Sequence, residues 1–176
     1  MKNLTLTFIF FAFLASVTNC QNSSRGTKDT FKFGILTFYS SSCNGTCPDI
    51  TMELTRWNQI QLIRTLYKKK GEVDTVNSGG FKGALQEKDY NAIVGLLSKI
   101  NWDNISFPDI QCCDAPVVTI LISYNNKAKR FRSMTPPKEV HELNKYLTDF
   151  LTNVSLPRYD KPMDFMVYDL PPDNNQ

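Results

Sequence analysis

The stretch Ser42-Cys43-Asn44-Gly45-Thr46-Cys47-Pro48-Asp49-Ile50 is the point around which the chain is organised. Its two cysteines flank a glycine turn, and a proline then leads into residues 50–55, where apolar and polar side chains alternate. A period of two residues predicts a strand with one buried face. This strand and the next one, over residues 59–67, are expected to form a hairpin.

Working outward, the pattern predicts several further strands. Residues 115–124 are almost continuously apolar, which is typical of a central strand covered on both faces. Arg56-Trp57-Asn58 and Asn125-Asn126 are expected to be hairpin turns, since asparagine tolerates the left-handed backbone conformation. A short edge strand is expected near the C-terminus. The full set of expected strands is 31–39, 50–55, 59–67, 81–85, 115–124, 128–133 and 163–168, with an exposed connection over 68–80.

Two amphipathic helices complete the domain. The first is expected over residues 87–100, and Gly95 inside it suggests close packing on the sheet. The second is expected to begin with Thr135 as its N-cap and Pro136 at its first position, and to stop before Pro157. Hairpins separated by helices predict an α+β fold, a mostly antiparallel sheet of about five to six strands packed by two helices in a two-layer sandwich.

The first residues have the form of an export signal. Lys2 gives a positive start, and residues 4–17 are almost wholly apolar. This run is shorter than the roughly 20 residues that a membrane-spanning helix needs, but it suits the core of a signal peptide. We therefore expect residues 1–19 to be a signal peptide.

The residues at the end of this leader predict lipidation. Val17-Thr18-Asn19-Cys20 resembles a bacterial lipobox, in which Cys20 would be acylated and become the mature N-terminus, although Asn19 replaces the usual small residue. Residues 20–30 are polar, as expected of a flexible tether, followed by a globular domain over 31–156 and a C-terminal extension over 157–176. The alternative is ordinary cleavage near Ser16 or Thr18, which would release a soluble protein.

The number of cysteines agrees with this interpretation. The chain has 5 cysteines, and an odd number in an exported protein suggests a separate role for one of them. With Cys20 lipidated, four disulfide candidates remain: Cys43, Cys47, Cys112 and Cys113. They allow three pairings. A small Cys43–Cys47 staple, a vicinal Cys112–Cys113 bond and a cross-link between the two pairs are all open.

A metal-binding interpretation is weaker. Cys-x-x-x-Cys-Pro resembles the copper-binding loop of Sco-type assembly proteins, and His141 would be the distant imidazole ligand. Those proteins have a helix after the second cysteine, whereas this chain has strand periodicity there. Four thiolates match a zinc site in number, but adjacent cysteines chelate one tetrahedral metal poorly. We predict no metal and no cofactor.

The sequence shows no recognisable combination of nucleophile, general base and orienting residue. The chain has 1 histidine, so a Ser–His–Asp or Cys–His arrangement is not supported, and we do not expect an enzyme. The formal net charge is +3 without a basic stripe, which argues against nucleic acid as a partner. The expected contact is the membrane, through the N-terminal lipid; a protein or small-molecule partner stays undefined.

Several of these features together resemble a known family. They are Gly45-Thr46-Cys47-Pro48 opening a strand, Glu87-Lys88-Asp89-Tyr90 starting a helix, Asp114-Ala115-Pro116 opening another strand, Tyr124-Asn125-Asn126-Lys127 as a turn, and a proline-started last helix. From about Gly34 to Val154 the chain resembles the bacterial family catalogued as domain of unknown function 6438. It departs from the family in Cys112-Cys113 and in Asp49-Ile50, where an aromatic is common.

The resemblance implies an exported or lipid-anchored protein of the bacterial cell envelope, and it brings no assigned activity. The function expected is that of a non-enzymatic binding or structural module. The alternative is an envelope thiol–disulfide or copper-handling protein that uses Cys43 and Cys47.

Overall fold

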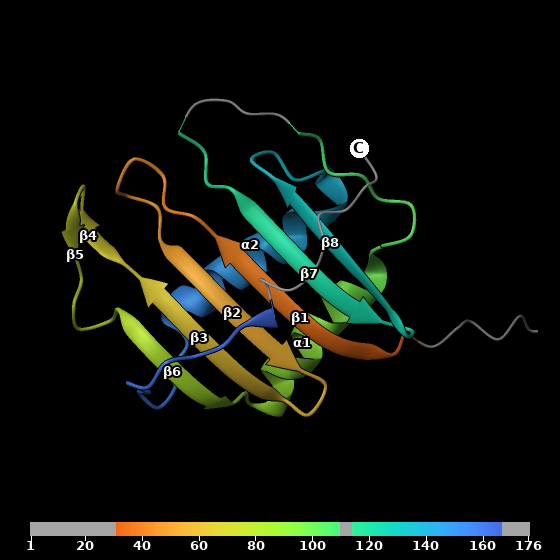
Figure 1. The fold of residues 1–176 in the computed structure, drawn as a ribbon, viewed down its shortest axis with the longest axis horizontal. Helices are drawn as coiled ribbons and strands as arrows, with labels where there is room; N and C mark the ends of the chain where they lie inside the picture. The colour runs from red at the N-terminus through yellow and green to blue at the C-terminus, as the bar shows by residue number, and fades with distance from the viewer. Residues whose placement is uncertain (1–30, 110–113, 167–176) are drawn as a thin grey trace, which may run out of the picture. The chain divides into compact units, whose positions relative to one another are not determined.

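The computed structural model describes residues 31–109 and 114–166, and it has the expected α+β architecture. Six strands form one antiparallel sheet in the order β6-β3-β2-β1-β7-β8, and the helices cover one face of it (Figure 1). The strands are β1 (Phe33–Ser40), β2 (Asp49–Thr55), β3 (Gln59–Thr65), β6 (Gly79–Ala84), β7 (Val118–Tyr124) and β8 (Lys127–Ser133). The prediction of a two-layer sandwich is confirmed.

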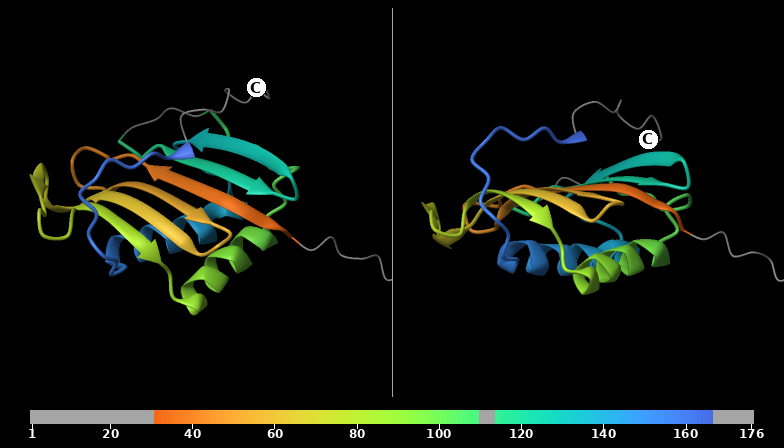
Figure 2. Two further views of the ribbon diagram at one scale, coloured as in Figure 1. Left: turned by 60° about the horizontal axis from the view of Figure 1, so that its bottom comes forward. Right: turned by 90° about the horizontal axis from the view of Figure 1, so that it is seen from below.

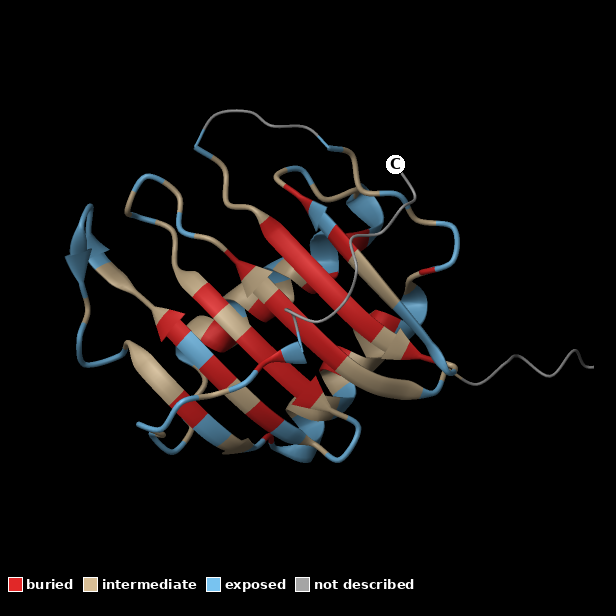
Figure 3. Cartoon of the chain, in the orientation of Figure 1, coloured by how far each residue is buried: buried red, intermediate tan, exposed pale blue. Residues whose placement is uncertain are grey.

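The two helices are α1 (Glu87–Lys99) and α2 (Lys138–Asn153), and both lie on the same side of the sheet (Figure 2). The core between the layers is apolar. Fully buried apolar side chains of the helices meet those of the central strands, which appear as red bands in Figure 3. They include Leu36, Phe38, Met52, Leu54, Ile60, Leu62, Ile93, Leu97, Ile120, Ile122, Val140 and Leu147, each with 0% exposure. Within the described ranges, no helix is long and apolar enough to cross a membrane.

Helix α2 begins later than the sequence predicted. Thr135 is not its N-cap: the cap is Pro137, which has extended backbone angles (φ −65°, ψ 158°) and no side-chain capping bond. A residue that precedes a proline is kept out of the helical region, so Pro136 before Pro137 delays the helix. The Thr135 backbone N–H instead donates to Ser133 Oγ at 3.0 Å.

Residues 68–80 are mostly exposed, as expected, and β4 (Tyr67–Lys69) and β5 (Glu72–Val73) form a small hairpin there. Two further expectations need correction. Strand β7 is buried on both faces as predicted, but it lies next to the edge of the sheet rather than at its centre. Gly95 does not pack closely on the sheet, since a Cβ there would meet nothing within 4 Å.

The chain after α2 crosses to the opposite face of the sheet. We call residues 157–166 the strap (blue in Figures 1 and 2). It begins with an antiparallel bridge between Arg158 and Phe81 of β6. Residues 163–166 form no strand, so the predicted edge strand is absent there; its last two residues lie outside the described part of the chain.

Candidate functional site

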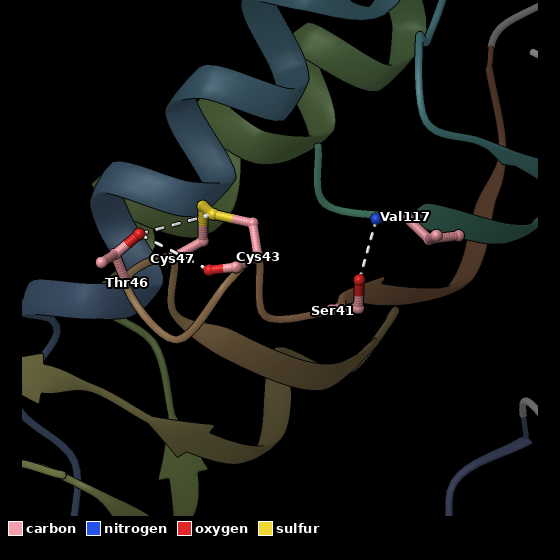
Figure 4. The surroundings of a disulfide bond; sticks show 5 residues. All are labelled: Ser41, Cys43, Thr46, Cys47 and Val117. Carbon is pink, nitrogen blue, oxygen red and sulfur yellow. Dashed lines mark hydrogen bonds between the residues drawn. A yellow bond between two sulfur atoms is a disulfide. The ribbon is translucent and has the colours of Figure 1, made fainter. Parts of the chain in front are cut away.

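The cysteine loop, residues 41–48 between β1 and β2, contains a formed disulfide between Cys43 and Cys47 (Figure 4). Asn44 and Gly45 reverse the chain with positive φ angles of 35° and 74°, a conformation that these two residue types accept readily. The Thr46 backbone N–H donates to the Cys43 carbonyl at 2.9 Å. The turn residues noted in the sequence therefore bring the two sulfur atoms together.

This loop is fixed to the rest of the domain at its tip and at its first residue. The Gly71 N–H, in the β4–β5 hairpin, donates to the Gly45 carbonyl at 3.1 Å. The Ser41 N–H donates to the Val117 carbonyl at 3.0 Å. In return, the Val117 N–H donates to Ser41 Oγ at 2.9 Å (Figure 4). The loop is thus a supported part of the fold.

The other sequence-predicted site residues are not brought to this loop within the described part of the chain. Cys20, Cys112 and Cys113 lie outside it, so lipidation and any pairing of the vicinal cysteines stay predictions. His141 lies in the first turn of α2, where Nε2 is 2.8 Å from the Pro136 carbonyl oxygen. Over residues 31–109 and 114–166, no three His, Cys, Asp or Glu side chains form a group that could hold a metal ion.

A second polar cluster lies on the sheet face that the helices leave open. Thr37, Glu53 and Gln61 stand opposite one another on β1, β2 and β3. Glu53 is only 7% exposed, and its carboxylate accepts hydrogen bonds from Gln61 Nε2 at 3.2 Å and from the Met166 backbone N–H at 3.0 Å. Thr37 is 1% exposed, and its hydroxyl has no hydrogen-bond partner among residues 31–109 and 114–166.

Sequence reasoning missed this cluster because the strap buries it. In the alternating stretch 50–55, Glu53 falls on the face assigned to solvent. The strap covers that face with Phe165, which is 9% exposed, and Gln61 Nε2 donates to the Asp164 carbonyl at 3.1 Å. The contact joins residues about a hundred positions apart, and local periodicity holds no information on it.

Arg64 is a third buried polar residue that the sequence did not reveal. It is 6% exposed, and its guanidinium donates to the carbonyls of Asn77 at 2.8 Å, Leu151 at 2.6 Å and Val154 at 3.1 Å. Two of these carbonyls belong to the C-terminal end of α2, where orphan acceptors and the helix dipole favour a cation. Burial, and secondarily the charge of Arg158, lower the pKa of Arg64.

A further charged cluster lies at the opposite end of the sheet from the cysteine loop. Asp103 accepts a hydrogen bond from the Tyr124 hydroxyl at 2.8 Å and pairs with Lys127 at 2.8 Å and Lys129 at 3.7 Å. The Lys127 hydrogen bond is the main reason that the pKa of Asp103 is lowered. Burial, the bond to Asp103 and its negative charge raise the pKa of Tyr124 to about 12.

Comparison with known proteins gives one positive result. No curated protein matches the chain. The family described as a domain of unknown function, number 6438, matches residues 35–151, which is well over half of the chain and spans the elements from β1 to the last turn of α2. The protein therefore belongs to this family of unknown function, as its sequence motifs indicated.

Proposed function

We propose that this protein is a lipid-anchored protein of the bacterial cell envelope, whose domain acts by binding or by structural support rather than by catalysis. The observation that carries the proposal is the Cys43–Cys47 disulfide in a loop that the fold supports. Disulfides persist in oxidising compartments such as the periplasm and cell surface. An export leader, Cys20 and a polar tether precede the domain in the sequence.

The proposal assigns separate roles to the cysteines. Cys20 would carry the acyl chains, and the Cys43–Cys47 bond would fix the loop between β1 and β2. A single acyl chain gives marginal membrane binding, whereas two give stable anchoring. The tether then leaves the domain free to meet a partner near the membrane.

The test is expression of the Cys20→Ala variant in a bacterial host. We expect it to lose incorporation of labelled fatty acid and to leave the membrane fraction. The matched control is the Cys43→Ser/Cys47→Ser variant, which should stay in the membrane because its anchor is intact. If the Cys20→Ala protein remains in membranes after a high-salt wash, the anchoring proposal is wrong.

One observation also favours the alternative of a thiol–disulfide or copper-handling protein. Cys43 and Cys47 are each only partly buried, so reductant can reach them. Peptide mass mapping after alkylation, without and with mild reduction, decides between the two. A bond that resists mild reductant is a structural staple, whereas thiols that alkylate readily and then bind Cu(I) in a titration support the carrier.

A further inference from the structure

The turn between β2 and β3 presents a tryptophan to solvent. Trp57 is 67% exposed, whereas the second tryptophan of the chain, Trp102, is 1% exposed in the core. The Arg56 guanidinium carbon lies 4.2 Å from the centre of the Trp57 ring. The tip of this turn is therefore an aromatic ring beside a cation.

This turn is held rigidly. Asn58 has a φ of 61°, its Nδ2 donates to the Leu85 carbonyl at 2.8 Å, and its Oδ1 accepts from the Leu85 N–H at 3.2 Å. The Tyr90 hydroxyl donates to the Arg56 carbonyl at 3.0 Å. Contacts to both ends of the turn keep Trp57 away from the core, so its exposure is built into the fold.

The tether joins the domain next to this turn. Strand β1 is antiparallel to β2, so its first residues lie beside the end of β2, and the Arg56 N–H donates to the Gly34 carbonyl at 2.7 Å (Figure 1). The Lys32 N–H donates to Asn125 Oδ1 at 2.8 Å, and the Asn125 N–H donates to the Lys32 carbonyl at 3.0 Å. The attachment point of residues 20–30 is thus pinned at the same end of the sheet as Trp57.

Positive charge exceeds negative charge at this end. Lys32 and Arg56 are exposed, and neither forms an ion pair with any residue that the structure describes. The acidic groups there are Asp103, which Lys127 and Lys129 already neutralise, and Glu87 and Asp89 in the first turn of α1, which also holds Lys88. Among the residues that the structure describes at this end, the cations therefore number five and the anions three.

We propose that the β2–β3 turn and Lys32 rest on the anionic phospholipid headgroups of the membrane that holds the protein. This inference depends on the lipid anchor proposed above. Tryptophan is enriched at the membrane–water interface, because one ring combines an apolar body with a polar N–H, and exposed cations are drawn to anionic headgroups. A partner protein could also bind Trp57 and these cations, but it would not require the attachment point of residues 20–30 to lie at the same end of the sheet. That position favours the membrane.

The length of the tether makes this contact an intramolecular event. A random-coil linker of eleven residues, the number in 20–30, has a root-mean-square span of about 18 Å, so a lipid on Cys20 would hold the near end of the domain close to the bilayer. Under such tethering even weak headgroup contacts are populated, because the effective concentration of the surface is high. Trp57 would then orient the domain with its cysteine loop facing away from the membrane.

The test uses the full lipidated chain in vesicles of phosphatidylethanolamine and phosphatidylglycerol that carry a spin label near the headgroup. We expect part of the tryptophan fluorescence to be quenched, and the Trp57→Phe variant, which keeps only the buried Trp102, to lose that quenching. The Lys32→Gln/Arg56→Gln variant should show weaker quenching. Its control, Lys68→Gln/Lys70→Gln, removes two exposed lysines near the opposite end and should behave as the wild type.

Vesicle flotation in the same samples separates this inference from the anchor. If the protein floats with the vesicles and Trp57 is not quenched, the anchor stands and the contact proposed here is wrong. If the full chain without substitutions does not float with the vesicles, the anchor proposal is wrong, and the headgroup contact proposed here is wrong with it. Equal quenching in Trp57→Phe and wild type would also overturn the assignment.

Discussion

At the scale of single residues, Arg64 shows how one buried cation joins two layers. It reaches from β3 to two carbonyls at the end of α2 and one in the connection before β6. We predict that Arg64→Met lowers the free energy of unfolding by about 3 kcal/mol, because three carbonyls lose their donor inside the protein. Urea denaturation followed by circular dichroism measures this.

The matched control for this change is Arg132→Met. Arg132 lies on the edge strand β8 and is exposed, so the same substitution there should change stability by no more than about 0.5 kcal/mol. Equal urea midpoints for Arg64→Met and the wild type would show that the guanidinium bonds do not stabilise the fold.

We predict that the raised pKa of Tyr124 makes the stability of the folded protein depend on pH in the alkaline range. The pKa of Tyr124 is raised from 10.0 to about 12, so the folded protein keeps the phenolic proton that an unfolded chain releases. The stability from this group is therefore fully present below pH 10 and is lost as the pH rises to about 12. Tyr124→Phe should lose less stability across this window than the wild type.

Ultraviolet absorbance of tyrosinate checks the same prediction directly. The late-titrating component of the wild type should be missing in Tyr124→Phe. In Asp103→Asn it should move to lower pH without reaching the ordinary value, because burial, the largest cause of the shift, remains. Superimposable titrations of wild type and Tyr124→Phe would contradict the assignment.

At the scale of elements, we predict that Gly→Ala has opposite effects on stability at two positions, Gly80 and Gly95. A Cβ on Gly80 of β6 would lie 2.5 Å from the Tyr159 carbonyl oxygen, so Gly80→Ala must push the strap off the sheet. Gly95 in α1 has open space around it, so Gly95→Ala should raise the free energy of unfolding by about 1 kcal/mol through helix propensity.

Limited trypsin digestion and urea denaturation measure this pair. Gly80→Ala should be cut faster after the exposed Arg158 of the strap and should unfold at lower urea, whereas Gly95→Ala should keep the wild-type cleavage rate and unfold at higher urea. Unchanged cleavage in Gly80→Ala would mean that the strap does not depend on this close contact.

Element positions also show what sequence periodicity can supply. The alternation in residues 50–55 and the apolar run of β7 each follow from local burial, so both strands were predicted at nearly their observed positions. The start of α2 was misplaced, because the effect of Pro137 on Pro136 outweighed the capping pattern of Thr135. A competing local preference, rather than a tertiary contact, caused that error.

At the scale of the whole molecule, the core between the sheet and the helices stabilises the fold, and the disulfide adds a smaller contribution. It closes a loop with a sequence separation of 4, and chain entropy for so short a loop gives about 2 kcal/mol. We predict that Cys43→Ser/Cys47→Ser lowers stability by about this amount and keeps the circular dichroism spectrum, since the sheet core is untouched. Loss of the folded spectrum at room temperature would refute this.

The candidate sites differ in how far apart in the sequence their contacting residues lie. The Cys43–Cys47 pair was anticipated, because its members share one turn. The Glu53 cluster and Arg64 were not, because each depends on segments brought together from distant parts of the chain. Fold class followed from local patterns, whereas the buried polar residues needed the tertiary structure.

The position of β1 has a mechanical consequence. The tether continues directly into this strand, which lies inside the sheet and is hydrogen-bonded to β2 on one side and β7 on the other. Ladder bonds run across the strands, so, with the proposed lipid anchor, tension between the membrane and a partner at the far end of the sheet would load both ladders in shear. Many bonds would then have to fail together, and the domain could bear force without unravelling from its N-terminal end.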